Sequence, residues 1–474
     1  MKTMCNFYRF VPMLVILGLA ACSEGGSSGT GLTAPAGSHT TQGAITGFGS
    51  VFVNGVEYDS KASTITLDGV AQSEDKLAVG MVVKVNGSVD AGGKTGVATT
   101  IDYADELEGI VLSIDAVAKT VNVMGQTVHV TAETLYAGAP AYSLATMQIN
   151  NVIEVSGYSS GRGDIHATRI ELKKAVFAGE EVELKGVVAN LNAGAKTFTV
   201  GTLVIDYNLA SVDALGGLSN DLYVEIKSTS APVNNTFVAT KIEVKGDGHK
   251  GVVGQAGETL ELEGIVTAVN STTAFDLNGQ AIVLNTQTQY ENGTVANIVA
   301  DTKLEVEGQF DASGNVIAKA VKFREASATG LSAYVSATDA TLNTVTVLGL
   351  TVQIDNLTVL KDERDDNGAV PERYFGVKYL SVDDFVEMQF YKNGSGAWVA
   401  TQLIRNNVES PGIVNLNGLI ESVAIAGQLT VAGVTVQIPN GDIKPYQNGA
   451  KVEITGTYAS NIITATAIAI VMGD

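Results

Sequence analysis

Apolar and polar residues alternate with a period of two in short runs along most of the chain. The pattern is clear at 80–87 (GMVVKVNG), 151–158 (NVIEVSGY) and 303–310 (KLEVEGQF). Such alternation is typical of β-strands that bury one face in a core. No segment shows a long period of 3.6 residues, so the pattern predicts an all-β protein in which helices are minor.

Three strand patterns recur six times in the same order. The first is an opening strand around a Gly, as in 45–53 (ITGFGSVFV) and 107–114 (LEGIVLSI). The second is an alternating strand such as 151–158, and the third is a closing strand such as 166–172 (HATRIEL). Most copies also carry a hairpin with a Gly near its centre, as in 275–284 (FDLNGQAIVL), because a tight turn needs a positive φ. Ordered repetition of this kind indicates a tandem array of one small module.

Each copy reads as three strands in a meander, a short connector long enough for a turn of helix, such as 210–221 or 294–301, and a final hairpin. This layout predicts about six five-stranded OB-like barrels, and a flat sandwich is the main alternative. Modules of this size are marginally stable alone, so neighbours should touch and form a semi-rigid rod. At about 28 Å per module, the rod would reach roughly 170 Å.

The repeats divide the chain into an N-terminal segment and six modules. The predicted units are a signal peptide (1–22), a flexible tether (23–42), module 1 (43–105), module 2 (106–174), module 3 (181–246), module 4 (259–325), module 5 (327–407, with an inserted loop at 361–376) and module 6 (412–474).

Composition narrows the classes of function. The net charge is −21, and such an acidic protein repels nucleic acid phosphates, so we expect no nucleic acid partner. The two cysteines, Cys5 and Cys22, both precede the modules. No disulfide and no cysteine-based metal site is therefore expected in the body of the protein.

The N-terminus has the features of a bacterial lipoprotein. Lys2 and Arg9 accompany an apolar run at 11–21 that is too short to span a membrane. The following Leu-Ala-Ala-Cys at 19–22 resembles the lipobox, which implies that Cys22 carries acyl chains that anchor the protein in a membrane. The resemblance also implies outer-membrane sorting, since Ser23 and not Asp follows the cysteine. Whether the protein faces the periplasm or the cell surface stays open.

The strings GAITGFGSVFVNGVEYDSKASTITLDG (43–69), LAVGMVVKVNG (77–87) and ATTIDYADELEG (98–109) resemble tandem-repeat bacterial lipoproteins of the domain of unknown function 5666 family. The match is sharpest in modules 1 and 2 and fades in modules 3 to 6. The family has no established activity, so the resemblance bears on fold and location and implies little about mechanism.

The sequence contains no recognisable catalytic motif. His129 and His166 each stand alone in a strand, without a nearby cysteine, second histidine or spaced carboxylate. We therefore expect no enzyme activity and no catalytic residues. An unrecognised hydrolase is an alternative that would need one of these histidines beside an acid and a nucleophile in a cleft.

The loop inserted in module 5 suggests one weak metal site. Glu363, Asp365 and Asn367 precede Gly368 with the alternating oxygen ligands of a calcium loop. The pattern departs from that loop at its first position, and at position twelve Tyr374 replaces Glu. Calcium is thus the one cofactor considered, and the preferred interpretation of this segment is a solvated charged loop without a bound ion.

These features predict a lipid-anchored, non-enzymatic cell-envelope protein that acts as a binding or spacer array. Its partners would be the membrane and an envelope or extracellular protein or a polysaccharide, which can stack on tyrosines. A calcium- or small-ligand-binding envelope protein and a hydrolase are the alternatives.

Overall fold

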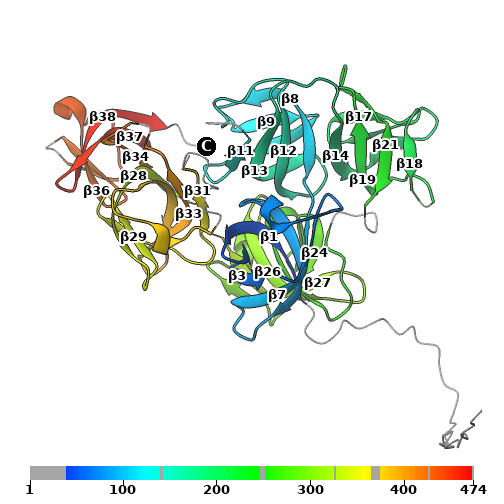
Figure 1. The fold of residues 1–474 in the computed structure, drawn as a ribbon, viewed down its shortest axis with the longest axis horizontal. Helices are drawn as coiled ribbons and strands as arrows, with labels where there is room; N and C mark the ends of the chain where they lie inside the picture. Colours follow the sequence, from blue (N-terminus) through cyan, green and yellow to red (C-terminus); the bar gives the residue numbers. More distant parts are fainter. Residues whose placement is uncertain are drawn as a thin grey trace, which may run out of the picture.

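The computed structural model describes residues 39–138, 142–214, 216–245, 251–324, 327–364, 374–408, 410–424 and 427–471. Within these ranges the regular structure consists of β-strands and four single-turn 3₁₀-helices (Figure 1). None of the helices in this part of the chain could cross a membrane. The all-β prediction is confirmed.

Module 1 forms a closed barrel of five strands. Strands β1 (His39–Phe48), β2 (Val51–Val53) and β3 (Val56–Asp59) make an antiparallel meander. β3 pairs in parallel with β7 (Thr95–Tyr103), and β6 (Val82–Val89) pairs antiparallel with both β7 and β1. This ring confirms the OB-like barrel, and the flat-sandwich alternative is wrong.

The same ring recurs in the other modules, with the first and last strands of module 3 each broken in two. Module 2 has β8 (Leu107–Asp115), β9 (Thr120–Val123), β10 (Gln126–His129), β12 (Val152–Ser159) and β13 (Asp164–Lys174). Module 3 has β14 (Val182–Val187), β15 (Ala189–Asn192), β16 (Thr197–Val200), β17 (Leu203–Asp206), β19 (Tyr223–Ser228), β20 (Thr236–Val238) and β21 (Lys241–Val244). Module 4 has β22 (Thr259–Ser271), β23 (Ala274–Leu277), β24 (Gln280–Val283), β26 (Lys303–Phe310) and β27 (Val316–Phe323).

Modules 5 and 6 complete the array. Module 5 has β28 (Thr329–Asp339), β29 (Thr344–Val347), β30 (Leu350–Gln353), β32 (Phe385–Lys392) and β33 (Trp398–Asn406). Module 6 has β34 (Ile413–Ala424), β35 (Gln428–Val431), β36 (Val434–Gln437), β37 (Lys451–Ala459) and β38 (Ile462–Val471).

The connector after the meander holds elements that the sequence analysis describes only in part. In modules 1 to 5 it adds a short strand that pairs in parallel with the last strand: β4 (Thr64–Leu67), β11 (Leu135–Ala137), β18 (Ser211–Asp213), β25 (Gln289–Glu291) and β31 (Val359–Asp362). Module 1 also has β5 (Val70–Gln72). The 3₁₀-helices are η1 (Glu74–Lys76), η2 (Val295–Asn297), η3 (Val377–Tyr379) and η4 (Pro439–Gly441). η2 confirms the helical turn predicted at 294–301, whereas the described residues of 210–221 contain β18 and no helix. The loop prediction at 361–376 is wrong for its first two residues, which belong to β31.

In modules 1 to 4 and 6 a glycine of the opening strand lies beneath its own hairpin. A Cβ at Gly109 would lie 2.8 Å from Met124 Sδ, so a side chain there would force Met124 to move. In module 1 the strand pairing puts Gly43 in this position, where a Cβ would lie 1.9 Å from Asn54 Oδ1. The opening strand of module 1 therefore begins before residue 45, the first residue of the strand predicted at 45–53. The tether prediction is wrong for residues 39–42, because they pair with β6 and with β22.

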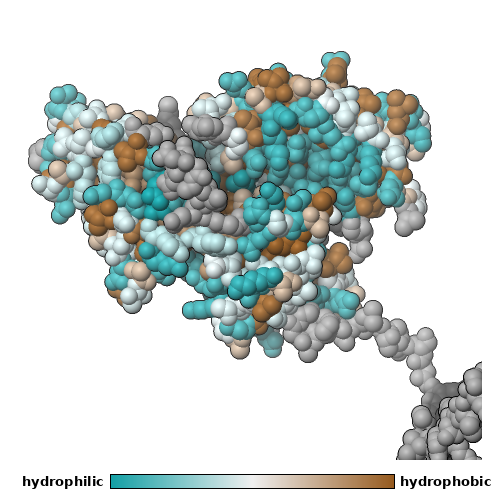
Figure 2. Space-filling model, in the orientation of Figure 1, coloured by the Kyte–Doolittle hydropathy of each residue, from teal (hydrophilic) through white to brown (hydrophobic). Residues whose placement is uncertain are grey.

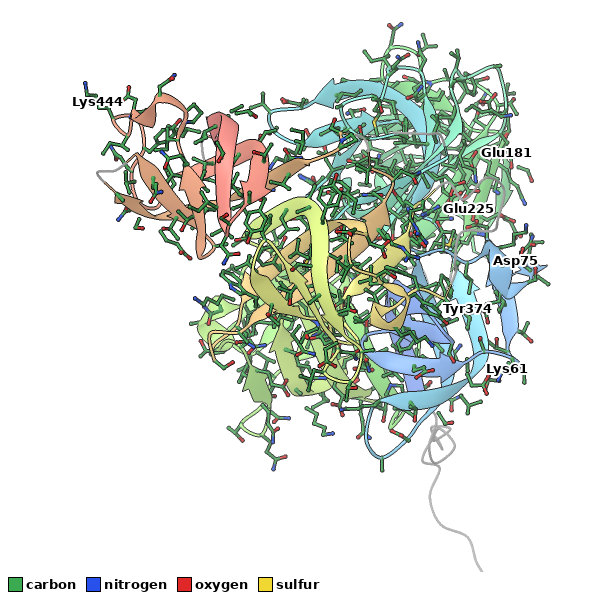
Figure 3. All side chains as sticks on the ribbon, turned by 60° about the vertical axis from the view of Figure 1, so that its left-hand side comes forward. Lys61, Asp75, Glu181, Glu225, Tyr374 and Lys444 are labelled. Atoms are coloured by element: carbon green, nitrogen blue, oxygen red, sulfur yellow. The ribbon has the colours of Figure 1, made fainter. Side chains whose placement is uncertain are left out.

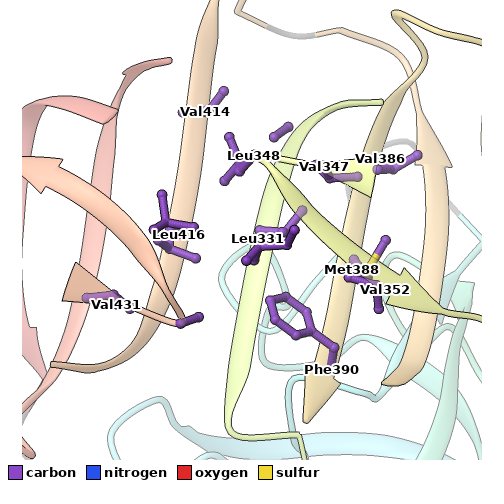
Figure 4. Packing of buried hydrophobic residues seen from close by; sticks show 14 of the residues in the cluster. Leu331, Val347, Leu348, Val352, Val386, Met388, Phe390, Val414, Leu416 and Val431 are labelled. Atoms are coloured by element: carbon purple, nitrogen blue, oxygen red, sulfur yellow. The ribbon is translucent and has the colours of Figure 1, made fainter. Parts of the chain in front are cut away.

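The barrels associate in three pairs through their first strands. β1 pairs in parallel with β22, β8 pairs antiparallel with β14, and β28 pairs antiparallel with β34. Module 1 is thus joined to module 4, module 2 to module 3, and module 5 to module 6. Across the last seam Leu331 pairs with Leu416, and the two side chains lie in one hydrophobic cluster shared by both barrels (Figure 4).

The three pairs cluster together, so the rod prediction is wrong (Figure 1). Tyr158 Oη of module 2 donates a hydrogen bond to Glu263 Oε1 of module 4 at 2.6 Å. Gln402 Nε2 of module 5 donates to the carbonyl oxygen of Glu133 in module 2 at 3.1 Å. The physical reason is that the first-strand edge of module 1 pairs with module 4, not with its neighbour in sequence, and this folds the array back on itself. Hydrophilic residues cover much of the visible face of modules 2 and 3 (Figure 2).

Candidate binding cleft between modules 1 and 5

A cleft of about 630 Å³ opens where module 1 meets module 5. Module 1 contributes the end of β1, the turn at 49–50, and residues of β2 and β3. Module 5 contributes residues around Asn356 and the segment 374–379. The volume falls in the range typical of ligand pockets, about 300–1,000 Å³.

Contacts between the two modules hold the walls of this cleft in place. Thr46 Oγ1 donates a hydrogen bond to the carbonyl oxygen of Asn356 at 3.3 Å, and Asn356 Nδ2 donates to that of Gly55 at 3.2 Å. Ile404 and Val359 of module 5 pack into the hydrophobic core of module 1. The cleft is therefore built into the resting fold and needs no closure to form.

Aromatic rings line both sides of the cleft. Tyr374 and Tyr379 are 51 % and 39 % exposed, and Phe52 on the opposite wall is partly exposed. Lys378 Nζ lies 4.8 Å from the centre of the Tyr379 ring. Tyr374 and Lys61 lie on the same side of the molecule (Figure 3). These rings offer flat apolar faces to a ligand.

The polar lining of the cleft is mainly acidic. Among the described residues, its charged side chains are four carboxylates and two lysines: Glu57, Asp59, Glu74, Asp355, Lys61 and Lys378. Ser50 Oγ donates to Glu57 Oε1 at 3.3 Å, and the Ser60 hydroxyl donates to the Glu74 carboxylate. The lining thus combines hydrogen-bond acceptors and donors with an excess of negative charge.

The structure describes only part of the sequence-predicted sites. Cys22, Asp365 and Asn367 lie outside the described residues, so the lipidation and calcium predictions stay predictions. Glu363 is exposed, and its carboxylate accepts a hydrogen bond from Lys361. Tyr374, which interrupts the calcium pattern, lines the cleft instead.

The view that His129 and His166 stand alone is wrong. β10 and β13 are parallel neighbours, and their register sets the two residues opposite one another. The rings stack with their centres 4.9 Å apart and their planes 16° apart. His129 Nε2 lies 3.0 Å from Asp164 Oδ1, and His166 Nε2 lies 3.4 Å from Asp301 Oδ1 of module 4. An acid is therefore present beside each ring, but neither histidine lines the cleft.

A second charged cluster, which the sequence analysis missed, lies between modules 1 and 3. Carboxylate oxygens of Asp68, Asp105 and Glu183 lie within 4.8 Å of one another, as metal ligands would. The buried Lys185 ammonium occupies this position: it bonds to Asp105, and lies 2.8 Å from Glu183 Oε1 and 3.4 Å from Asp68 Oδ1. The cluster is thus an internal ion network.

The protonation of this network follows from its burial. Desolvation raises the pKa of Asp105 well above its ordinary value. Burial also acts to raise the pKa of Glu183, but Lys185, together with hydrogen bonds from Lys227 and Asp105, outweighs it and lowers that pKa to about 2. Burial acts to lower the pKa of Lys185, whereas the surrounding carboxylates raise it well above its ordinary value. The ammonium group stays charged and links module 3 to module 1.

Comparison with known proteins identifies the repeat. A family described as "Domain of unknown function (DUF5666)" matches six stretches: 42–102, 108–171, 185–243, 263–322, 333–403 and 417–469. No curated protein matches the chain. Among solved structures, a similar chain is a multidomain protein with nucleic acid binding domains from Streptococcus pneumoniae TIGR4. It is 11 % identical, with 44 % of this chain and 71 % of that chain covered, and its TM-score of 0.11 supports no further comparison.

Proposed function

The chain belongs to the domain of unknown function 5666 family, in six tandem copies, and from this premise we propose that it is a lipid-anchored binding scaffold of the bacterial cell envelope. The anchor is an acylated Cys22 in the outer membrane. The modules act without catalysis and bind an envelope or extracellular partner.

The N-terminal segment carries this proposal. This segment has the parts of a lipoprotein signal peptide in the expected order. They are the basic residues Lys2 and Arg9, the apolar run at 11–21 and the Leu-Ala-Ala-Cys string at 19–22. Two or three acyl chains on one cysteine give stable membrane attachment, whereas a single chain is marginal.

The arrangement of the modules supports a binding scaffold over a long spacer. Six barrels joined edge to edge in three pairs make a short, thick particle, and a preformed cleft lies between two of them. The net charge of −21 favours a protein or polysaccharide partner over nucleic acid.

Metabolic labelling with an alkyne analogue of palmitate tests the anchor in a Gram-negative host. We expect label on the wild-type chain, none on Cys22→Ala, and undiminished label on the matched control Cys5→Ala. The wild type should fractionate with the outer membrane, and Ser23→Asp should move to the inner membrane. Label on the Cys22→Ala variant, or no label on the wild type, would refute the proposal that Cys22 is acylated. Protease treatment of intact cells then distinguishes the cell surface from the periplasm.

A further inference from the structure

We infer that the cleft between modules 1 and 5 binds a neutral oligosaccharide segment of a larger glycan. The inference deepens the proposed binding function by naming the chemical class of the ligand, and its test does not depend on the anchor.

The position of the cleft on the barrel is the first argument. OB-like barrels bind extended polymers of sugars or nucleotides across the second and third strands and the loop between the first and second. In module 1 these elements are β2, β3 and the turn at 49–50, and all three contribute to the cleft. The volume of about 630 Å³ suits a few sugar rings of a longer chain.

The aromatic lining is the second argument. Tyr374 and Tyr379 expose their rings at the rim although the tyrosines of the cores are buried, and Phe52 contributes from module 1. Leaving such rings partly exposed forgoes part of the free energy of burying them. A pyranose ring has apolar C–H faces that can stack on these rings while its rim of hydroxyls stays hydrated.

The charges of the lining select among polymers. Four carboxylates against two lysines repel nucleic acid phosphates and the uronates of acidic glycans. Carboxylates such as Glu57 and Asp59 accept hydrogen bonds from sugar hydroxyls, and Lys61 donates to them. A basic peptide would also suit the acidic charge and could place its cations on the tyrosine rings, so it is one outcome of the test.

A glycan array carrying neutral glucans, N-acetylhexosamine oligomers and uronic acid polymers tests the inference. The probe is the full chain in a detergent without a sugar headgroup. We expect binding to at least one neutral class and none to uronic acid polymers. Titration with a hexasaccharide of that class should show about a tenfold loss or more in Tyr374→Ala, and near-wild-type affinity in Tyr374→Phe, which keeps the ring.

The contradicting outcomes are distinct. Three results would each overturn the glycan assignment. They are no binding of any neutral glycan, an affinity of Tyr374→Ala equal to that of the wild type, and binding of a decalysine peptide alone. Tyr446→Ala in module 6, far along the chain from the cleft, should leave binding intact, and the melting temperature of every variant shows whether it folds. If palmitate labelling succeeds while all glycans fail, the anchored scaffold stands and only this ligand is lost.

Discussion

At the scale of the residue, glycines in the hairpin turns meet two different constraints. Gly125 and Gly433 have φ of 79° and 77°, in the left-handed region that disfavours a side chain. At Gly433 a Cβ would contact only Leu350 Cδ2, at 3.9 Å, so Gly433→Ala should cost the backbone strain alone, about 1–2 kcal/mol of unfolding free energy. At Gly125 a Cβ would lie 2.7 Å from Leu203 Cβ of module 3, and Gly125→Ala should cost more.

Thermal melting together with amide hydrogen exchange at the two hairpins measures these losses. Gly394→Ala is the control, since Gly394 lies outside the left-handed region and a Cβ at this position would have no neighbouring atom within 4 Å. The melting temperature of Gly394→Ala should equal that of the wild type. Equal stability of Gly433→Ala and Gly394→Ala would contradict the left-handed turn.

At the scale of the element, the parallel pairing of β10 with β13 creates a site that responds to pH. Desolvation lowers the pKa of His166, the stacked His129 lowers it further, and Asp301 and Asp164 oppose both. A lowered pKa means that the unfolded state binds the proton more readily. The stability contribution of neutral His166 is therefore present above about pH 6.5 and is lost as the pH falls below that value. We expect the drop in melting temperature from pH 7 to pH 5 to be smaller in His166→Gln than in the wild type.

The proton equilibrium can also be followed directly by NMR titration of the imidazole carbon-bound hydrogens. In His129→Gln the neighbouring positive charge is removed, so the pKa of His166 should rise toward its ordinary value. An unchanged pKa in that variant would show that the ring stacking does not couple the two groups.

At the scale of the whole molecule, Lys185 of module 3 joins that module to module 1 from a buried position. Lys185→Met keeps the approximate length of the side chain but leaves Asp105 buried without its cation, whereas Glu183 keeps Lys227 at 2.8 Å. Removing one partner of a buried ion pair typically costs about 3–5 kcal/mol. We expect a lower melting temperature and, by small-angle X-ray scattering, a larger radius of gyration as module 3 separates from module 1.

The matched control is Lys319→Met. Lys319 makes a similar contact, 2.6 Å from Glu307 Oε1, but its side chain is 74 % exposed, and solvent screens the pair. Melting temperature and scattering should match the wild type. A Lys185→Met protein with wild-type dimensions and melting temperature would mean that strand pairing alone sets the arrangement.

Much of the fold could be predicted because its signals are local. Alternation with a period of two identifies the strands, and turn glycines such as Gly279 and Gly433 mark the hairpins. Repetition of these signals predicts the barrel and its copy number. The short parallel strands such as β25 were missed, because three residues carry too little pattern. They are positioned by contacts such as the hydrogen bond of 2.9 Å from Thr288 Oγ1 to the carbonyl oxygen of Ala318.

The candidate sites depended on contacts that no local pattern contains. The cleft joins residues some 310 positions apart, as the bond from Thr46 to Asn356 shows, and the stacked histidines are 37 positions apart. By itself the sequence determined the strands, the barrels and the expected anchor at Cys22, because side-chain periodicity and short motifs are properties of neighbouring residues. Only the tertiary structure decided which first strands pair, and hence the clustered shape, the cleft and the Lys185 network. Every barrel offers a similar edge, and the choice among edges rests on side chains that meet only after folding.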